Sequence, residues 1–237
     1  MTILALGGGG FSMEPDNPLL DDFLLSLATR RRGSSDQPRV CFVPTASGDA
    51  ASYIDCFTAA FKGRAETSTL ELFHLADLVE VDLRTFVLAQ DVVYVGGGST
   101  ANLLALWRLH GLDEIFREAL AEGVVVAGIS AGMICWFESS VTDSFGPLAA
   151  LSDGLGMLSG SACPHYDGEA ERRPTYLALV GSRRLPAGYA VDDGCALLFR
   201  DGALVEAVSS RPEAQASRVH LAGGVVAESP VEVRYLG

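Results

Sequence analysis

The stretch Val124-Val125-Val126-Ala127-Gly128-Ile129-Ser130-Ala131-Gly132 decides how the rest of the chain is interpreted. The apolar run 124–127 predicts a buried strand, and the apolar residues that follow predict a helix over 131–137. Between them lies the G-x-S-x-G pattern of a nucleophile elbow, in which small residues flank a serine on a tight strand-to-helix turn. We therefore expect Ser130 above the carboxyl end of a sheet, at the positive end of the next helix. The alternative is a glycine-rich turn with an incidental serine.

Strands and helices alternate on both sides of this stretch. The expected strands are Ile3–Leu6, Val40–Val43, Leu70–Phe73 and Asp91–Val95, and the expected helices are Asn17–Thr29, Ala51–Phe61 and Thr100–Glu122. Strands that are apolar on both faces and separated by helices are typical of an α/β fold, with a mostly parallel sheet and helices on both faces.

After Gly188 the pattern becomes mostly β, with a hairpin turn at Asp201-Gly202. The expected strands there are Tyr189–Val191, Cys195–Phe199, Ala203–Val208, Arg218–Leu221 and Val231–Tyr235. The sequence contains no obvious linker or repeat. We therefore expect one α/β domain over residues 1–237, with a β-rich C-terminal extension of the sheet.

Composition excludes several classes of protein. The chain has 237 residues, 49% of them hydrophobic, which is too apolar for a disordered protein. Its net charge is −13 and its only basic cluster is Arg30-Arg31-Arg32, so we expect no nucleic-acid partner. The longest uncharged apolar stretch, Val124–Phe137, is shorter than the ~20 residues of a membrane span, so no membrane partner is expected.

The cysteines and the N-terminus indicate a compartment. The five cysteines are dispersed, with no C-x-x-C pair, which predicts reduced, buried thiols instead of disulfides or a zinc site. The N-terminal apolar run has no basic region before it and ends at Gly7, so no signal peptide is expected. The expected location is the cytoplasm.

A serine nucleophile needs a base, and the chain has four histidines. His165 lies in a polar loop, where a rigid scaffold can present it to a substrate, and it is the favoured base. His74 and His220 fall in apolar strand patterns, and His110 ends a helical pattern before Gly111. These three are expected to be structural.

The acid that orients the histidine is less clear from the residues. Asp193 follows a strand and precedes Gly194, so it can lie at the active edge of the sheet, and it is favoured. Asp143 is the main alternative, and Asp192 and Glu138 remain open. Glu138 is expected on the helix after Ser130, about 12 Å along its axis and away from the serine.

Two glycine-rich stretches follow predicted strands. Gly96-Gly97-Gly98 opens a helix, where free N–H groups attract negative charge. Beside a serine nucleophile such groups stabilise an oxyanion, so we expect an oxyanion hole formed by the Gly98 and Ala131 amides. Gly7–Gly10 suggests a dinucleotide loop only weakly, because it lacks the G-x-G-x-x-G continuation.

Three motifs in order resemble those of the peptidase E (aspartyl dipeptidase) family of serine peptidases, whose relatives include cyanophycinase. The motifs are Val95-Gly96-Gly97-Gly98-Ser99-Thr100, Gly128-Ile129-Ser130-Ala131-Gly132 and Cys163-Pro164-His165-Tyr166-Asp167. The resemblance implies a fold like that of class I glutamine amidotransferases, a serine nucleophile and a Ser-His-acid triad.

The resemblance also bears on the acid and on specificity. In that family the structural acid is a glutamate just before a glycine, and Asp193 matches that position with aspartate instead. Asp143 is the nearest counterpart of an aspartate that matters after the nucleophile helix. Two departures, Ser99 in place of the usual asparagine and the helix sequence Met-Ile-Cys-Trp-Phe-Glu, argue against assuming strict α-aspartyl specificity.

The sequence thus predicts a serine peptidase that hydrolyses dipeptides or short peptides, among them peptides with an acidic N-terminal residue, through an acyl-enzyme. Ser130, His165 and Asp193 are the expected triad. A small peptide is the expected partner, no cofactor or metal is expected, and the chain is expected to be a monomer or homodimer. The alternatives are a non-catalytic ligand-binding or sensor module on the same fold, and a serine esterase or amidase.

Overall fold

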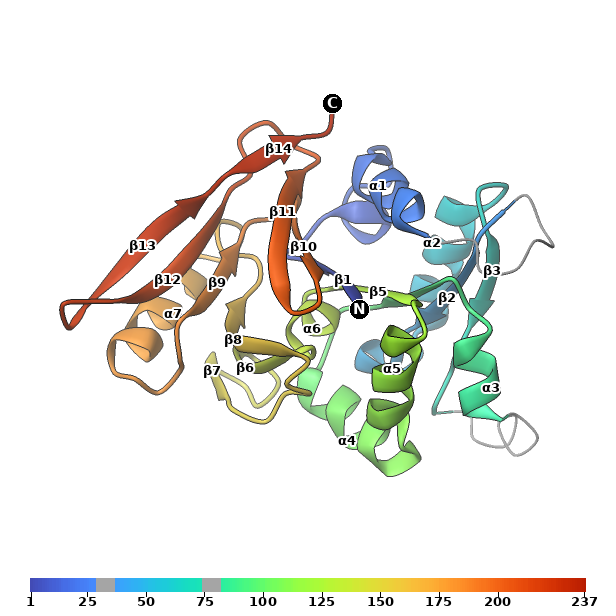
Figure 1. Ribbon diagram of the computed structural model, residues 1–237, viewed down its shortest axis with the longest axis horizontal. Coiled ribbons are helices and arrows are strands. Elements are labelled where there is room, and N and C mark those ends of the chain that lie inside the picture. Colours follow the sequence, from blue (N-terminus) through green and yellow to red (C-terminus); the bar gives the residue numbers. More distant parts are fainter. Residues whose placement is uncertain (29–36, 74–81) are drawn as a thin grey trace.

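The computed structural model describes residues 1–28, 37–73 and 82–237, and these form two sheets (Figure 1). The larger sheet has eight strands in the order β14-β11-β10-β1-β5-β4-β2-β3, and the smaller has six in the order β13-β12-β9-β8-β6-β7. The sequence features Arg30-Arg31-Arg32 and His74 lie outside the described residues.

Parallel strands form the centre of the larger sheet. They are β1 (Thr2–Leu6), β2 (Arg39–Val43), β3 (Glu66–Thr69), β4 (Val92–Val95) and β5 (Val125–Ile129). Three C-terminal strands extend the sheet beyond β1: β10 (Cys195–Arg200) and β11 (Ala203–Ser209), which are antiparallel, and β14 (Val233–Tyr235). This confirms the mostly parallel α/β fold with a β-rich extension. The expectation that all the C-terminal strands extend this sheet is wrong, because Tyr189–Val191 and Arg218–Leu221 lie in the smaller sheet.

Both faces of the larger sheet are buried, as the apolar strand sequences require. On β1, Ile3 and Ala5 pack into one core, whereas Leu4 and Leu6 pack into another on the opposite face. The second core is covered by α1 (Leu19–Leu27) and α2 (Ala51–Phe61), and the first by α3 (Leu83–Leu88), α4 (Thr100–His110) and α5 (Leu112–Ala121).

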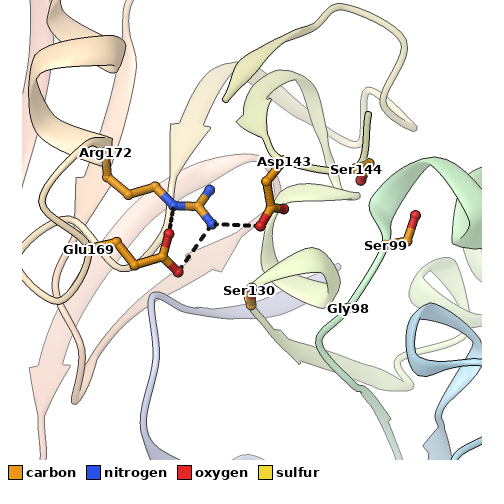
Figure 2. A pocket seen from close by; sticks show the side chains of 7 residues that line it. All are labelled: Gly98, Ser99, Ser130, Asp143, Ser144, Glu169 and Arg172. Atoms are coloured by element: carbon orange, nitrogen blue, oxygen red, sulfur yellow. Dashed lines mark hydrogen bonds and ion pairs between the residues drawn. The ribbon is translucent and has the colours of Figure 1, made fainter. Parts of the chain in front are cut away.

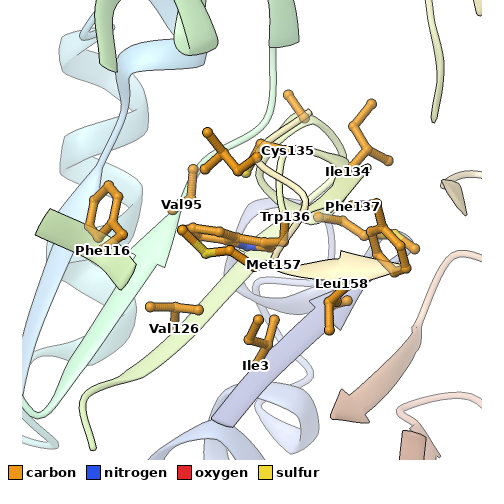
Figure 3. Close-up of a cluster of buried hydrophobic side chains, with 14 of the residues drawn as sticks. Ile3, Val95, Phe116, Val126, Ile134, Cys135, Trp136, Phe137, Met157 and Leu158 are labelled. Carbon is orange, nitrogen blue, oxygen red and sulfur yellow. The ribbon is translucent and has the colours of Figure 1, made fainter. Parts of the chain in front are cut away.

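The smaller sheet packs beside the first core. Its strands are β6 (Phe137–Thr142), β7 (Ala149–Leu151), β8 (Leu158–Cys163), β9 (Gly188–Val191), β12 (Ala216–Ala222) and β13 (Val225–Val231). Helix α7 (Arg172–Gly181) packs against β12 and β13, whose hairpin extends away from the larger sheet (Figure 1). Buried Trp136 lies among side chains of both sheets, Val126 and Leu158 among them (Figure 3).

Several expected elements are wrong in detail. The predicted helix Thr100–Glu122 is two helices, because Gly111 adopts a left-handed conformation with φ 68° and ends α4. The predicted strand Leu70–Phe73 lies outside β3; the strand is the polar segment before it, which an edge position tolerates. The predicted helix over 131–137 ends at Ile134, and Phe137 instead starts β6, which pairs with β8.

All five cysteines are free, as expected, but the expectation that all are buried is wrong, because Cys56 is exposed. Within the described ranges, none of the helices has the length and apolar character needed to cross a membrane.

One carboxylate is buried without a full set of partners. Asp21 on α1 is 2% exposed, and its Oδ1 atom has no hydrogen-bond partner among the described residues. A Cβ on Gly10 would lie 3.2 Å from this oxygen and 3.3 Å from the equally unpartnered Tyr94 hydroxyl. Burial raises the pKa of Asp21 from 3.8 to about 7. The folded protein therefore favours the protonated acid.

We predict that Asp21→Asn stabilises the protein relative to wild type, and that this stabilisation is larger at pH 8 than at pH 5. Because the pKa is higher in the folded state, that state binds more protons between about pH 4 and pH 7, and the wild-type free energy of unfolding falls as the pH rises through this window. Asparagine does not titrate. Urea unfolding should show the variant gaining on the order of 2 kcal/mol over wild type between pH 5 and pH 8. Exposed Asp16→Asn is the control, and parallel profiles for all three proteins would contradict the prediction.

Candidate active site

Ser130 lies on a strained turn between β5 and α6 (Ala131–Ile134), as the sequence predicts. Its backbone has φ 55° and ψ −112°, a conformation that L-residues rarely adopt. Gly128 and Gly132 make the turn possible: a Cβ on them would lie 2.2 Å from the Gly132 carbonyl oxygen and 2.3 Å from the Val95 carbonyl oxygen, respectively. The turn therefore requires glycine on both sides of the serine.

The structure pairs His165 with Asp193. His165 follows β8, with φ 51°, and Asp193 lies between β9 and β10. The His165 Nδ1 and Asp193 Oδ1 atoms are 2.6 Å apart, and because an ionised carboxylate only accepts, Nδ1–H is the donor. Asp193 is 9% exposed, and its own N–H donates to Asp167 Oδ1 at 2.8 Å. The pair is thus largely shielded from water and held in one orientation.

Three consecutive carbonyls at the end of β1 hold these segments in place. The Leu6 oxygen accepts the Ser130 N–H at 3.2 Å, the Gly7 oxygen accepts the His165 N–H at 3.1 Å, and the Gly8 oxygen accepts the Gly194 N–H at 3.1 Å. Sequence reasoning missed this role, since it weighed Gly7–Gly10 only as a weak dinucleotide loop. The available signal was a glycine run directly after the first strand.

The other acids weighed as partners of His165 are bonded elsewhere. Asp143 is 59% exposed, and its Oδ2 atom lies 3.9 Å from Arg172 Nη2. Glu138 lies on β6 and accepts the Gly160 N–H at 2.8 Å, so its expected place on a helix is wrong. Asp192 accepts the Gln215 N–H at 3.0 Å. Burial, with smaller effects from nearby carboxylates, raises the Asp192 pKa to about 6.

The remaining described histidines lie apart from this pair. His110 is in the last turn of α4, with a buried Nε2 that has no partner among the described residues. His220 is on β12, where its Nδ1 is 3.4 Å from the Arg218 carbonyl oxygen. Neither ring contacts the Ser130 turn through a hydrogen bond within the described ranges.

Two backbone N–H groups lie next to Ser130 in space or in sequence. Gly98, with φ 134°, lines the same pocket as Ser130, and Ala131 begins the helix after it. Neither N–H donates to an acceptor within the described part of the chain. A Cβ on Gly97 would lie 3.3 Å from Ser130 Cβ, so the glycine triplet passes directly beside the serine.

The pocket at Ser130 has a volume of about 350 Å³ and is strongly charged (Figure 2). Arg172 is only 3% exposed; its Nε donates to Glu169 Oε2 at 2.7 Å, and its guanidinium extends toward Asp143. The lining residues are Gly98, Ser99, Ser130, Asp143, Ser144, Glu169 and Arg172. Sequence reasoning missed Glu169 and Arg172, whose i,i+3 spacing directly after the histidine loop was the available signal. No group of three or more His, Cys, Asp or Glu side chains in the described ranges is arranged to hold a metal ion.

An elbow serine at the carboxyl edge of an α/β sheet, with a histidine–carboxylate pair bonded to the neighbouring strand end, defines the class of serine hydrolases. The family model for peptidase family S51 matches residues 3–207, and the chain belongs to that family. It is therefore a serine-type peptidase, and the resemblance to peptidase E is confirmed.

Relatives agree with this assignment. The chain is 54% identical over 236 residues to the uncharacterized peptidase YgaJ of Bacillus subtilis (strain 168), with 99% of each chain covered. It is 24% identical over 194 residues to the uncharacterized peptidase Lin0382 of Listeria innocua serovar 6a, with 75% of this chain and 88% of that protein covered.

Two solved structures share the fold. A crystal structure of a peptidase from an acI-B1 Actinobacterium has a TM-score of 0.67 at 16% identity, covering 98% of this chain and 94% of that one. A candidate peptidase E protein from Listeria monocytogenes EGD-e has a TM-score of 0.60 at 19% identity, covering 86% and 96%. At these identities the likeness supports the fold alone.

We predict that Gly8→Ala abolishes Ser130 reactivity by displacing the acid. The new Cβ would lie 1.9 Å from Asp193 Oδ1 and 3.0 Å from His165 Nδ1, so the pair cannot keep its geometry. Labelling by a fluorophosphonate probe should fall by roughly 100-fold or more, given the ~10⁴-fold loss when a triad acid is disabled. Gly181→Ala, whose Cβ has its first contact at 3.6 Å, is the control. Normal labelling of a folded Gly8→Ala protein would show that the Asp193 position is unimportant.

Proposed function

We propose that this protein hydrolyses dipeptides or short peptides through an acyl-enzyme formed on Ser130. The observation that carries the proposal is the 2.6 Å contact between His165 and Asp193, on segments bonded to the same strand end as Ser130. We also propose that the protein works in the cytoplasm, as a monomer or homodimer, as the sequence leads us to expect.

The proposed reaction follows from which atoms of the three side chains carry a proton. With Nδ1–H donating to Asp193, the His165 Nε2 atom has a free lone pair and accepts the Ser130 proton as the hydroxyl oxygen attacks the scissile carbonyl. His165 then gives that proton to the leaving amine. A water molecule, deprotonated by the same Nε2 atom, then attacks the ester carbonyl. As the bond between the acyl carbon and Ser130 Oγ breaks, Nε2 returns the proton to Oγ, and Ser130 is restored.

The developing negative charge on the carbonyl oxygen needs donors that are already in place. The Gly98 and Ala131 N–H groups fit this role, because each lies next to Ser130 in space or in sequence and neither donates to the described protein. Donors fixed before the reaction stabilise the oxyanion without reorganisation in the transition state.

The pocket supports a small, charged substrate. Its volume of about 350 Å³ is at the lower end of the range for small-molecule sites. Two carboxylates, Asp143 and Glu169, line the pocket against one cation, Arg172, and this excess of negative charge favours the free ammonium group of a peptide N-terminus. Arg172, buried and planar, can in addition pair with a carboxylate on the first residue of the substrate.

We expect a fluorophosphonate probe to label the wild-type protein at Ser130, because an activated elbow serine reacts with such probes and a non-catalytic binding module does not. Ser130→Ala should abolish labelling and peptide hydrolysis while changing the free energy of unfolding by less than about 1 kcal/mol. Intact-mass spectrometry after labelling, together with a dipeptide library read by mass spectrometry, checks both outcomes. An unlabelled wild type, or an unchanged turnover in Ser130→Ala, would overturn the proposed function. Cleavage of esters or simple amides but not peptides would indicate an esterase or amidase.

A comparison of acids tests the assignment of Asp193. Asp193→Asn should lower turnover on the order of 10⁴-fold, because an amide can hold the wrong histidine tautomer. Asp143→Asn should act more weakly and mainly on KM, since this side chain lies in the substrate pocket beside Arg172. Asp192→Asn serves as the neighbouring control. A fully active Asp193→Asn beside an inactive Asp143→Asn would reverse the assignment.

A further inference from the structure

Tyr53 joins the Ser130 site to the aromatic core on the far side of the glycine triplet. Its hydroxyl accepts the Gly97 N–H at 3.3 Å. Its ring packs against Phe42, with centroids 5.0 Å apart at 72°, and against Phe11 at 5.6 Å. A Cβ on Gly96 would lie 3.0 Å from Tyr53 Cε1, so the ring also packs closely against the triplet backbone.

The triplet needs such contacts because glycine backbones rotate freely. Three successive glycines have no Cβ to restrict them, and their peptide planes can flip at little cost. The Gly96 N–H donates to Val43 O at 3.1 Å and the Ser99 N–H to Ala46 O at 2.8 Å, so both ends are fixed by backbone. Between these ends lie the N–H groups of Gly97 and Gly98. Within the described structure, the Gly97 N–H is held by Tyr53, whereas the Gly98 N–H has no acceptor.

We propose that Tyr53 is a positioning residue for the oxyanion hole. By accepting the Gly97 N–H, its hydroxyl fixes the peptide plane between Gly96 and Gly97. The bond from the Ser99 N–H to Ala46 fixes the plane between Gly98 and Ser99. The plane that carries the Gly98 N–H lies between these two, and its rotation is thereby restricted. This inference rests on the proposed function, because the role of Gly98 belongs to it.

The hydroxyl lies close to a second polar side chain. Burial raises the pKa of Tyr53 above its usual value, so the phenol stays protonated, and the Ser12 side chain lies near enough to affect that pKa. Ser12 Oγ in turn donates to the Gly9 carbonyl oxygen at 3.4 Å. Tyr53 thus connects the glycine triplet beside Ser130 with the Gly7–Gly10 loop, which supports His165 and Asp193.

Tyr53→Phe tests the inference, because it keeps the ring and removes only the hydroxyl. The rate of Ser130 modification by a fluorophosphonate probe is measured over a range of probe concentrations, which separates the maximal rate of inactivation from the concentration for half-maximal rate. The attack on phosphorus places negative charge on an oxygen in the same hole. We expect the maximal rate to fall roughly tenfold, less than the 10²–10³-fold loss for removing an oxyanion donor outright, with the half-maximal concentration unchanged within about twofold.

Tyr94→Phe is the matched control. Tyr94 belongs to the same aromatic cluster, with its ring centroid 5.1 Å from that of Phe11, but its hydroxyl has no partner among the described residues. We expect this variant to keep the wild-type maximal rate within about twofold. Thermal unfolding of both variants checks that the fold is intact.

The outcomes test the positioning role of Tyr53 and the proposed function separately. A normal maximal rate in Tyr53→Phe, or an equal loss in both variants, would overturn the positioning role and leave the proposed function standing. A change only in the half-maximal concentration would also overturn it, because it would place Tyr53 in probe binding. A wild type that is not labelled at all would overturn the proposed function, and this inference with it.

Discussion

The end of β1 is the constraint on which the whole site depends. Its carbonyls at Leu6, Gly7 and Gly8 accept one N–H each from the segments that carry Ser130, His165 and Asp193. Backbone hydrogen bonds are short and directional, so three of them in succession fix the relative positions of segments that lie far apart in the sequence. The glycines are required for a second reason: a Cβ on Gly8 would occupy the place of the Asp193 carboxylate. The end of β1 thus holds the three segments in place and, because Gly8 has no side chain, leaves space for the Asp193 carboxylate.

The site also lies where the two sheets meet. Ser130 follows β5 of the larger sheet, His165 follows β8 of the smaller, and Asp193 lies on the crossing from β9 to β10. Relative movement of the sheets would separate Ser130 from His165. A buried cluster that includes Trp136 and spans both sheets opposes such movement, because protein interiors are close-packed and resist deformation (Figure 3). Core packing therefore contributes to the geometry of the chemistry.

Charged groups are arranged differently in the His165–Asp193 pair and in the Ser130 pocket. In the pair, Asp193 is buried and its oxygen is bonded to His165, so its orientation is fixed. In the pocket, Arg172 is buried with Glu169 as a close partner, while Asp143 remains open to solvent. Buried charges are tolerated when they are paired. The first arrangement suits proton transfer, and the second leaves polar groups available to a substrate.

The sequence alone determined the elements whose signal is local. The strand, the G-x-S-x-G turn and the helix start around Ser130 follow from nine consecutive residues, because steric limits on a tight turn act between neighbours. The tertiary structure decided what depends on distant partners. Phe137 could continue a helix or begin a strand, and only its pairing with β8 makes it a strand. Likewise, Asp143 and Asp193 were both plausible acids in the sequence. The structure turns Asp143 toward Arg172 and brings Asp193 to His165. Asp193 is brought there because the next residue, Gly194, donates its N–H to Gly8, which lies next to the residue that holds the His165 backbone, and no local pattern in the sequence records that contact.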